Sequence, residues 1–351
     1  MLETIGYDAD TARLAAPHLR AADTSLGRVV RVDRGLTSLL TDTGPVRAGA
    51  GGALLAEMAK DPTEGPCTGD WCVLRHWPDH RVTLERVLPR RTSVVRAVSG
   101  EQSRGQVLCS NVDLAVVVVA LHPLPVPAKV ERLVALAWES GAPPLVVLTK
   151  ADLVGDAEQV AEDVRATTPD VEVLVVSART GQGVDDLRSR LQGRLTAALV
   201  GASGHGKSSL TNALVGAEVL STRAIRDDGR GRHTTVRREL VPLPGGGAVI
   251  DTPGLRGVGL IDAEQGLART FADVEDLAAR CRFGDCAHTG EPGCAVAAAV
   301  ADGTLAQRRF ESWQHLQREN AWIASRSDAR LRADRVRQWR RRTRDAGRAR
   351  P

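Results

Sequence analysis

The sequence predicts an α/β protein: a doubly wound, mostly parallel sheet, preceded by a small β-barrel and followed by a mostly helical segment. Short strand-like segments separated by turns fill the first hundred residues, apolar runs then alternate with helical stretches, and after residue 265 the strand pattern stops. The expected boundaries are an N-terminal extension at 1–25, a barrel at 26–98, the α/β domain at 105–268, a helical domain at 269–325 and an arginine-rich tail at 326–351.

The composition indicates a globular chain with a sizeable core. Hydrophobic residues make up 42% and charged residues 26% of the 351 positions, which excludes disordered, collagen-like and disulfide-knot proteins. The first twenty residues carry charges and lack the apolar region of a signal peptide. The longest apolar run, 112–121, is about half as long as a membrane span. We therefore expect a soluble, cytoplasmic protein with no membrane partner.

The net charge of +4 is unevenly distributed along the chain. Residues 321–351 contain eleven arginines against three aspartates, so this end carries a local charge of +8 and the remainder is acidic. Arginine side chains contact nucleic-acid phosphates in a salt-dependent manner. The distribution favours phosphate contacts by the tail, and a solvated extension without a partner is the alternative.

Residues 26–98 show the short, turn-bounded strands of a small barrel. The strand-like segments are 26–32, 38–40, 70–74 and 82–88. Clusters of glycine, threonine and proline at 41–45 and 49–52 are interpreted as turns, and 99–106 has the composition of a linker. Trp71 and Trp77 are assigned to core packing, with base stacking as the alternative.

From residue 112 onward, apolar strands alternate with helices, which is typical of a doubly wound parallel sheet. The strand-like runs are 112–121, 145–149, 171–176, 197–200, 240–243 and 248–250. Apolar residues at helical spacing occur at 129–139 and 184–191.

Residues 201–208 match the phosphate-binding pattern G-x-x-x-x-G-K-[ST], with a strand before the match and a helical segment after it. The glycines let backbone N–H groups surround an anion at the start of the helix. We expect Lys207 to be a catalytic residue that reaches the β- and γ-phosphates, Ser208 to ligate Mg²⁺, and the side chain of His205 to point away. The expected nucleotide contacts are Gly201, Ala202, Ser203, Gly204, His205, Gly206, Lys207, Ser208 and Ser209.

Two further segments predict a site for magnesium and the γ-phosphate. Asp251 ends a strand and is followed by Thr-Pro-Gly254, which suits a carboxylate contact to Mg²⁺ and a backbone N–H from Gly254 to the γ-phosphate. The polar, glycine-rich segment 229–235 suits a mobile switch. Thr234 or Thr235 is its expected nucleotide and magnesium ligand; Thr235 is favoured and is also expected to be a catalytic residue.

Selectivity for guanine is predicted by Thr149-Lys150-Ala-Asp152 at the end of a strand. A carboxylate at Asp152 accepts hydrogen bonds from both N1–H and the exocyclic amine of guanine, a pair of donors that adenine lacks. Lys150 is expected to lie along the base. Thr149 stands where most GTPases have asparagine, which is expected to weaken a supporting contact. Ser177 and Ala178 resemble the loop that contacts O6 of guanine.

Together these motifs predict a GTPase whose motif order is circularly permuted. The base-reading motifs precede the phosphate loop, whereas in ordinary GTPases they follow it. Domain termini usually lie close together at the surface, so such a rearrangement preserves the fold. A P-loop kinase is disfavoured because Asp152 has no role in one. The permutation also places a further domain shortly after Gly254, where the nucleotide state can move it.

Three cysteines and a histidine cluster within 14 residues near the end of the chain. The pattern Cys-x4-Cys-x-His-x5-Cys supplies a Cys₃His set, which matches tetrahedral structural zinc, one ion per chain. The expected ligands are Cys281, Cys286, His288 and Cys294. Cys67 and Cys72 are interpreted as small buried hydrophobic residues.

The chain resembles the ribosome small-subunit-dependent GTPase A family (RsgA, also called YjeQ) over about residues 26–325. The resemblance rests on the permuted order, the Cys/His spacing and four segments: 87–92, 106–113, 231–235 and 251–254. It implies an N-terminal OB-fold, a central GTPase domain and a C-terminal zinc domain. It also implies a role in late maturation of the small ribosomal subunit, with GTP hydrolysis stimulated by that subunit. The expected partners are the subunit, its rRNA and GTP or GDP, and the chain is expected to be a monomer.

Leu255 stands where a small GTPase has the glutamine that orients the attacking water. Slow intrinsic hydrolysis follows, because leucine cannot hydrogen-bond water. The resemblance and the position beside the switch threonines both nominate His233 as a catalytic residue, with a packing role as the alternative.

Two other functions remain open. One is a nucleotide-gated RNA-binding factor in which hydrolysis only times release, and the other is a permuted GTPase of large-subunit assembly.

The barrel is a candidate RNA-binding surface. An OB barrel is a common RNA platform, and four arginines lie near its end: Arg90, Arg91, Arg96 and Arg104.

Overall fold

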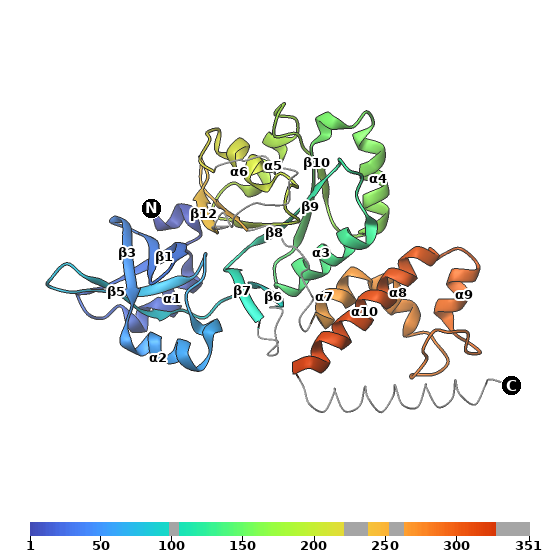
Figure 1. Ribbon diagram of the computed structural model, residues 1–351, viewed down its shortest axis with the longest axis horizontal. Coiled ribbons are helices and arrows are strands. Elements are labelled where there is room, and N and C mark those ends of the chain that lie inside the picture. The colour runs from blue at the N-terminus through green and yellow to red at the C-terminus, as the bar shows by residue number, and fades with distance from the viewer. Residues whose placement is uncertain (98–104, 221–237, 253–262, 328–351) are drawn as a thin grey trace, which may run out of the picture. The chain divides into compact units, whose positions relative to one another are not determined.

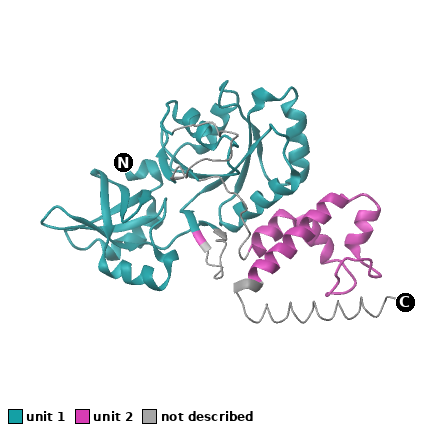
Figure 2. Cartoon of the chain, viewed as in Figure 1, with its two compact units in different colours: residues 1–95, 107–257 teal, residues 96–106, 258–351 magenta. Residues whose placement is uncertain are grey.

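A computed structural model describes residues 1–97, 105–220, 238–252 and 263–327 (Figure 1). The chain divides into two compact units (Figure 2), the first comprising 1–95 with 107–257 and the second 96–106 with 258–351. No helix of the described residues combines the length and the apolar character needed to cross a bilayer.

The first five strands form a closed barrel in the order β1-β2-β3-β5-β4. They are β1 (Thr24–Asp33), β2 (Leu36–Thr41), β3 (Gly44–Ala50), β4 (Trp71–His76) and β5 (Val82–Val87). Within this barrel β3 and β5 are parallel and the other neighbouring strands are antiparallel. A helix and a short 3₁₀ turn, α2 (Gly52–Lys60) and η3 (Pro62–Glu64), connect β3 to β4. This order and closure confirm the predicted OB-type barrel.

The expected turns at 41–45 and 49–52 are wrong in part, because strand β3 runs between Gly44 and Ala50. Its glycines and Pro45 look like turn residues in the sequence, yet β3 pairs with β2 on one side and β5 on the other. Trp71 is 3% exposed and Trp77 is half-buried, in agreement with core packing for Trp71.

The N-terminal residues form structure of their own, namely η1 (Leu2–Ile5), α1 (Ala9–Ala15) and η2 (Ala16–His18). Leu2 and Ile5 are buried, and the carbonyl of Thr4 accepts a hydrogen bond from the amide of Gly247. The carboxylate of Asp8 caps α1 by accepting from the amide of Thr11. This segment is therefore packed onto the first unit.

The six-stranded sheet has the order β10-β9-β8-β11-β13-β12, and only β12 is antiparallel. Its strands are β8 (Leu114–Ala120), β9 (Pro144–Thr149), β10 (Val173–Val175), β11 (Thr196–Val200), β12 (Glu239–Pro242) and β13 (Ala248–Asp251). The accompanying helices are α3 (Pro127–Glu139), η4 (Ala151–Leu153), α4 (Ala157–Thr167), α5 (Val184–Leu191) and α6 (Lys207–Val215).

Both faces of this sheet are buried, as the continuous apolar runs of its strands require. Val116 and Val118 of β8 join a core with Leu187 of α5 and Leu210 of α6. The alternate residues of β8 are equally buried, and α3 lies against that strand (Figure 1). Because five of the strands are parallel, their carboxyl ends meet at one edge of the sheet.

The second unit is mostly helical, with α7 (Glu264–Thr270), α8 (Ala272–Ala278), α9 (Ala295–Ala301) and α10 (Gln307–Ser327). The buried Arg309 of α10 binds both carboxylate oxygens of Asp273 and lies over the ring of Phe271.

A separate two-stranded sheet pairs β6 (Ser93–Ala97) with β7 (Gly105–Ser110). The prediction of a linker at 99–106 is therefore wrong for its last two residues, which belong to β7.

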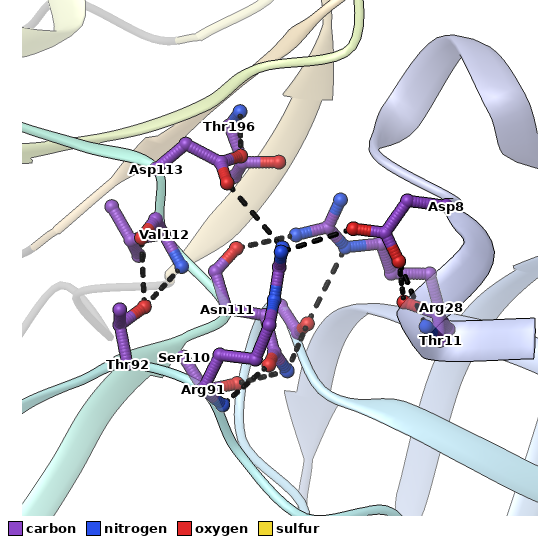
Figure 3. Close-up of polar contacts among 11 residues, drawn as sticks. Asp8, Thr11, Arg28, Arg91, Thr92, Ser110, Asn111, Val112, Asp113 and Thr196 are labelled. Atoms are coloured by element: carbon purple, nitrogen blue, oxygen red, sulfur yellow. Dashed lines mark hydrogen bonds and ion pairs between the residues drawn. The ribbon is translucent and has the colours of Figure 1, made fainter. Parts of the chain in front are cut away.

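A network of polar contacts joins the barrel to the amino ends of the sheet strands, and we call it the barrel–sheet junction (Figure 3). Arg28 of β1 is 1% exposed, and its Nη2 donates to the carbonyl of Asn111 at 2.9 Å. Burial lowers the pKa of Arg28 to about 10, although Asp113 opposes this shift. Asp113 in turn accepts from the amide of Thr196 at 2.8 Å, where β11 begins.

Two of the arginines near the end of the barrel form ion pairs within the first unit. Arg91 forms ion pairs with Asp8 at 3.0 Å and Asp113 at 3.3 Å. Arg90 binds the fully buried carboxylate of Asp70 through Nε and Nη2, each at 2.8 Å. The side chain of Arg90 is 18% exposed and that of Arg91 is 37% exposed, and the expectation that they contribute to an RNA surface stays a prediction. Arg104 lies outside the described residues, and the side chain of Arg96 is not described.

We expect the substitution Arg28→Leu to lower the free energy of unfolding by about 2 kcal/mol, because it takes the donor from the buried carbonyl of Asn111 and one of two donors from that of Gly69. Urea denaturation followed by tryptophan fluorescence measures the change. Arg31→Leu, on the same strand but in a half-buried ion pair, is the control and should cost less than about 1 kcal/mol. Equal losses for the two variants would contradict the junction's role.

Candidate nucleotide site and metal centre

The carboxyl edge of the six-stranded sheet collects the predicted nucleotide motifs. Ser177 follows β10, Thr149 ends β9, Gly201 follows β11 and Asp251 ends β13. These positions are far apart in the chain, but their strands are neighbours or next neighbours in the sheet. Such an edge is where open α/β sheets bind ligands.

The phosphate loop connects β11 to α6, whose first residue is Lys207. Gly204 and Gly206 have φ angles of 82° and 85°, a region that favours glycine. The side chain of Lys207 is largely buried, and its Nζ donates to the carbonyls of Gly201 and Ala202, each at 2.9 Å. Burial lowers the pKa of Lys207, and Asp251 opposes that shift.

His205 turns its ring towards the sheet. Its Nδ1 lies 3.1 Å from the carbonyl oxygen of Val118 in β8, and burial lowers the pKa of the imidazole. The expectation that this side chain points away from a bound phosphate agrees with that contact. The backbone carbonyl of His205 has a separate role.

The hydroxyl of Thr149 donates to the carbonyl of His205 at 2.7 Å. This hydrogen bond links the base-reading motif to the phosphate loop across 56 residues of sequence. The hydroxyl of Thr149 thus makes a direct contact with the loop, and the expectation that this contact is weaker than that of an asparagine stays a prediction. We name this contact the Thr149–His205 link.

The carboxylate of Asp152 is bound on both oxygens. Ser177 donates its hydroxyl to Oδ1 at 2.5 Å, and Arg179 donates from Nε to Oδ2 at 2.7 Å. These two hydrogen bonds lower the pKa of Asp152, in that order of importance. Lys150 adopts a left-handed backbone conformation with φ of 62° just before the 3₁₀ turn that carries Asp152. Sequence reasoning missed Arg179, for which no spacing rule gives a signal.

Two of the residues predicted to bind magnesium, Ser208 and Asp251, contact each other. The hydroxyl of Ser208 donates to Asp251 Oδ2 at 2.7 Å, while the buried Oδ1 has no hydrogen-bond partner among the described residues. Burial raises the pKa of Asp251, a cost that a nearby cation would remove. A hydroxyl beside an unpaired carboxylate oxygen is a donor set that fits Mg²⁺.

Several predicted residues lie outside the described residues. They are His233, Thr234, Thr235, Gly254 and Leu255.

Asn212 of α6 holds the last described residues before position 221. Its Oδ1 accepts from the amides of Val219 and Leu220, and its Nδ2 donates to the carbonyl of Leu220 at 2.8 Å. The sequence analysis did not single out this asparagine.

In the second unit, the four predicted metal ligands converge. Ligand atoms of Cys281, Cys286, His288 and Cys294 all lie within 4.8 Å of one another. The sulfur atoms of Cys281 and Cys294 are 3.9 Å apart, and Nδ1 of His288 is 3.5 Å from each. Tetrahedral zinc with ordinary bond lengths separates two sulfurs by about 3.8 Å and sulfur from nitrogen by about 3.5 Å. The residues therefore fit a zinc ion.

The surroundings of this cluster orient its ligands. The sulfur of Cys294 caps α9 by accepting from the amide of Ala297 at 3.3 Å. The carboxylate of Glu291 accepts from the amides of Ala287 and Thr289, which flank His288. Trp313 of α10 packs edge-on against the imidazole of His288.

Comparisons with known proteins agree on one family. Residues 87–261 match the family model described as RsgA GTPase. A protein of Streptomyces avermitilis named small ribosomal subunit biogenesis GTPase RsgA is 50% identical over 340 residues, covering 96% of this chain and 90% of its own. The protein of the same name from Streptomyces coelicolor is 49% identical over 346 residues, covering 97% and 92%.

Two solved structures share the fold. The crystal structure of YjeQ from Thermotoga maritima is 24% identical and aligns with a TM-score of 0.63 over 85% of this chain and 98% of that one. YloQ, described as a circularly permuted GTPase, is also 24% identical and aligns with a TM-score of 0.60 over 86% and 97%. The permuted arrangement expected from the motif order is thereby confirmed.

Removing the hydroxyl of Thr149 should loosen the Thr149–His205 link. We expect Thr149→Val to weaken the binding of GDP about fivefold, the effect of one lost neutral hydrogen bond, and Thr149→Ser to restore it. Isothermal titration measures the affinity. Thr168→Val, which removes a buried hydroxyl bonded within the end of α4, is the control and should bind as the wild type does. Wild-type affinity in Thr149→Val would refute the link's contribution.

Purified protein should contain one zinc per chain by elemental analysis, and Cys286→Ala should lose it because a tetrahedral site needs its fourth ligand. Cobalt(II) substitution should give the intense absorption of a thiolate-bound tetrahedral ion. Cys72→Ala, a buried thiol of the barrel, should leave the metal content unchanged. Full zinc retention in Cys286→Ala would exclude this ligand set.

Proposed function

This chain belongs to the RsgA GTPase family, and from that membership we propose that it acts in late maturation of the small ribosomal subunit. It is a GTP hydrolase, as the family description and the names of its relatives state. The two relatives described above are named for biogenesis of the small subunit. We propose the same partner for this chain, together with the rRNA of that subunit, and a monomeric, cytoplasmic state.

One observation carries the assignment of the nucleotide site. The Thr149–His205 link joins the base-reading motif to the phosphate loop, and the Ser208–Asp251 hydrogen bond joins that loop to the magnesium carboxylate. A single guanine nucleotide lying along the carboxyl edge of the sheet would contact the base-reading motif, the phosphate loop and the carboxylate of Asp251. This supports the nucleotide contacts that the sequence predicts on β9, β10, β11 and β13.

Each end of the nucleotide then has a defined function in binding. At the base, Asp152 accepts from the two donors on the Watson–Crick edge of guanine, and Ser177 holds the carboxylate in place. At the phosphates, the amides of the loop donate and Lys207 exchanges the carbonyls of Gly201 and Ala202 for phosphate oxygens. Mg²⁺, when bound, neutralises charge on the β- and γ-phosphates.

Hydrolysis also needs groups that lie outside the described residues. We propose that Thr235 completes the magnesium shell, that Gly254 donates its amide to the γ-phosphate, and that His233 orients the attacking water because Leu255 cannot. The hydrogen bonds between Asn212 and Leu220 hold the chain in place just before the segment that contains His233 and Thr235.

The remaining parts of the chain are assigned to binding and to stability. We propose that the barrel contacts rRNA, that zinc is the ion held by the Cys₃His cluster, and that the tail at 326–351 contributes salt-dependent phosphate contacts. The segment boundaries expected from the sequence, at 26–98, 105–268 and 269–325, are proposed as the divisions between these functions.

The proposal is tested by measuring GTP hydrolysis with purified small subunits, with large subunits and alone, at two salt concentrations. Strong stimulation by small subunits only, weakening as salt rises, is expected. Stimulation by large subunits instead would favour the alternative of large-subunit assembly. Ribosome occupancy that depends on the bound nucleotide, without any stimulated hydrolysis, would favour a nucleotide-gated RNA-binding factor. His233→Ala should retain GTP binding and lose the stimulation.

Changing the acceptor pair at the base should change the preferred nucleotide. Asparagine offers one acceptor and one donor, which matches xanthine, whose C2 carries an oxygen where guanine has an amine. We therefore expect Asp152→Asn to bind and hydrolyse XTP in preference to GTP, with a shift in relative affinity of at least about a hundredfold, since the contact at C2 becomes repulsive for guanine and attractive for xanthine. Competition with a fluorescent nucleotide measures the preference. Unchanged GTP preference would place the base elsewhere.

A further inference from the structure

We propose that Arg179 competes with guanine for the carboxylate of Asp152, so that it lowers the affinity for guanine nucleotides and accelerates their release. This inference deepens the proposed function and rests on it. The arginine is a positioning residue for nucleotide exchange, acting through the carboxylate that selects the base.

The geometry places the arginine on the accessible side of that carboxylate. The side chain of Asp152 is 9% exposed, whereas that of Arg179 is 71% exposed, and their Oδ2 and Nε atoms are 2.7 Å apart. The guanidinium therefore lies between the carboxylate and solvent. A base that arrives from solvent has to take the place of the guanidinium to reach Oδ2.

The two competitors present the same chemical group. The edge of guanine that an aspartate reads is an N–C–N unit with N–H donors on adjacent nitrogens, and a guanidinium carries the same unit with a full positive charge. A carboxylate suited to one is suited to the other. Ser177 does not compete in this way, because it is buried and holds Oδ1 from the protein side.

The loop that carries Arg179 keeps its backbone fixed, so exchange needs only rotation of the arginine side chain. Ser177 donates its amide to the carbonyl of Gln182 at 2.9 Å, and Gly181 donates to the carbonyl of Ser177 at 2.9 Å. The amide of Thr180 also donates to the hydroxyl of Ser177 at 3.2 Å. A long, exposed side chain on a rigid loop can leave the carboxylate and return to it quickly.

Arg179→Gln is the variant that tests this competition, because it removes the charge and keeps an unbranched polar side chain. We expect it to bind GDP about twofold to fivefold more tightly, mainly through slower dissociation, as suits the loss of one partly exposed ion pair. Stopped-flow fluorescence with a labelled GDP gives both rate constants. The difference from wild type should shrink in high salt, because salt screens the ion pair.

Arg190→Gln is the matched control, since it removes an equal charge from another exposed ion pair, with Glu172. It should bind GDP as the wild type does. A second comparison uses the Asp152→Asn background with XDP, where adding Arg179→Gln should have a smaller effect because the carboxylate is gone. A purely structural role for Arg179 would instead weaken binding in both backgrounds.

Two outcomes are distinguishable. A wild-type protein that prefers GDP over ADP, with Arg179→Gln binding GDP equally or more weakly, overturns the competition and leaves the proposed function intact. A wild-type protein without preference for GDP over ADP overturns both.

Discussion

The proposed nucleotide site depends on the hydrogen bond that Thr149 donates to the carbonyl of His205. This contact fixes the distance between the loop that reads the base and the loop that surrounds the phosphates, because the two strands that carry them, β9 and β11, are not neighbours. Strand β8 separates them and contributes through Val118, whose carbonyl faces the ring of His205. Three strands thus set one spacing, and the proposed guanine nucleotide has to match it.

Circular permutation is tolerated because the site requires adjacency in the sheet and not order along the chain. Parallel strands place their carboxyl ends at one edge whichever strand comes first. The residues at the amino ends of β8 and β11 are not needed for nucleotide contacts. In this protein they form polar contacts with the barrel. Asp113 and Thr196 stand at the amino ends of these strands, opposite the nucleotide edge.

Much of the fold and the site was predictable because the signals are local. The phosphate loop, the strand before it and the Cys/His spacing each lie within a few residues, so pattern alone identifies them. Strand β3 was missed because its glycines and Pro45 are typical of turns, and only pairing with β2 and β5 makes them a strand. The same limit applies to Arg90 and Arg179, whose partners Asp70 and Asp152 lie 20 and 27 residues away.

Arg28 makes the barrel difficult to exchange for that of another protein. Its guanidinium needs the carbonyls of Gly69 and Asn111, and a side chain at Gly6 would collide with its Nη1. A chimera that imports only the five strands would therefore bury a cation among mismatched loops. Module swapping in this architecture has to transfer the N-terminal residues and the 110–113 segment as one block, so these regions should have diverged together.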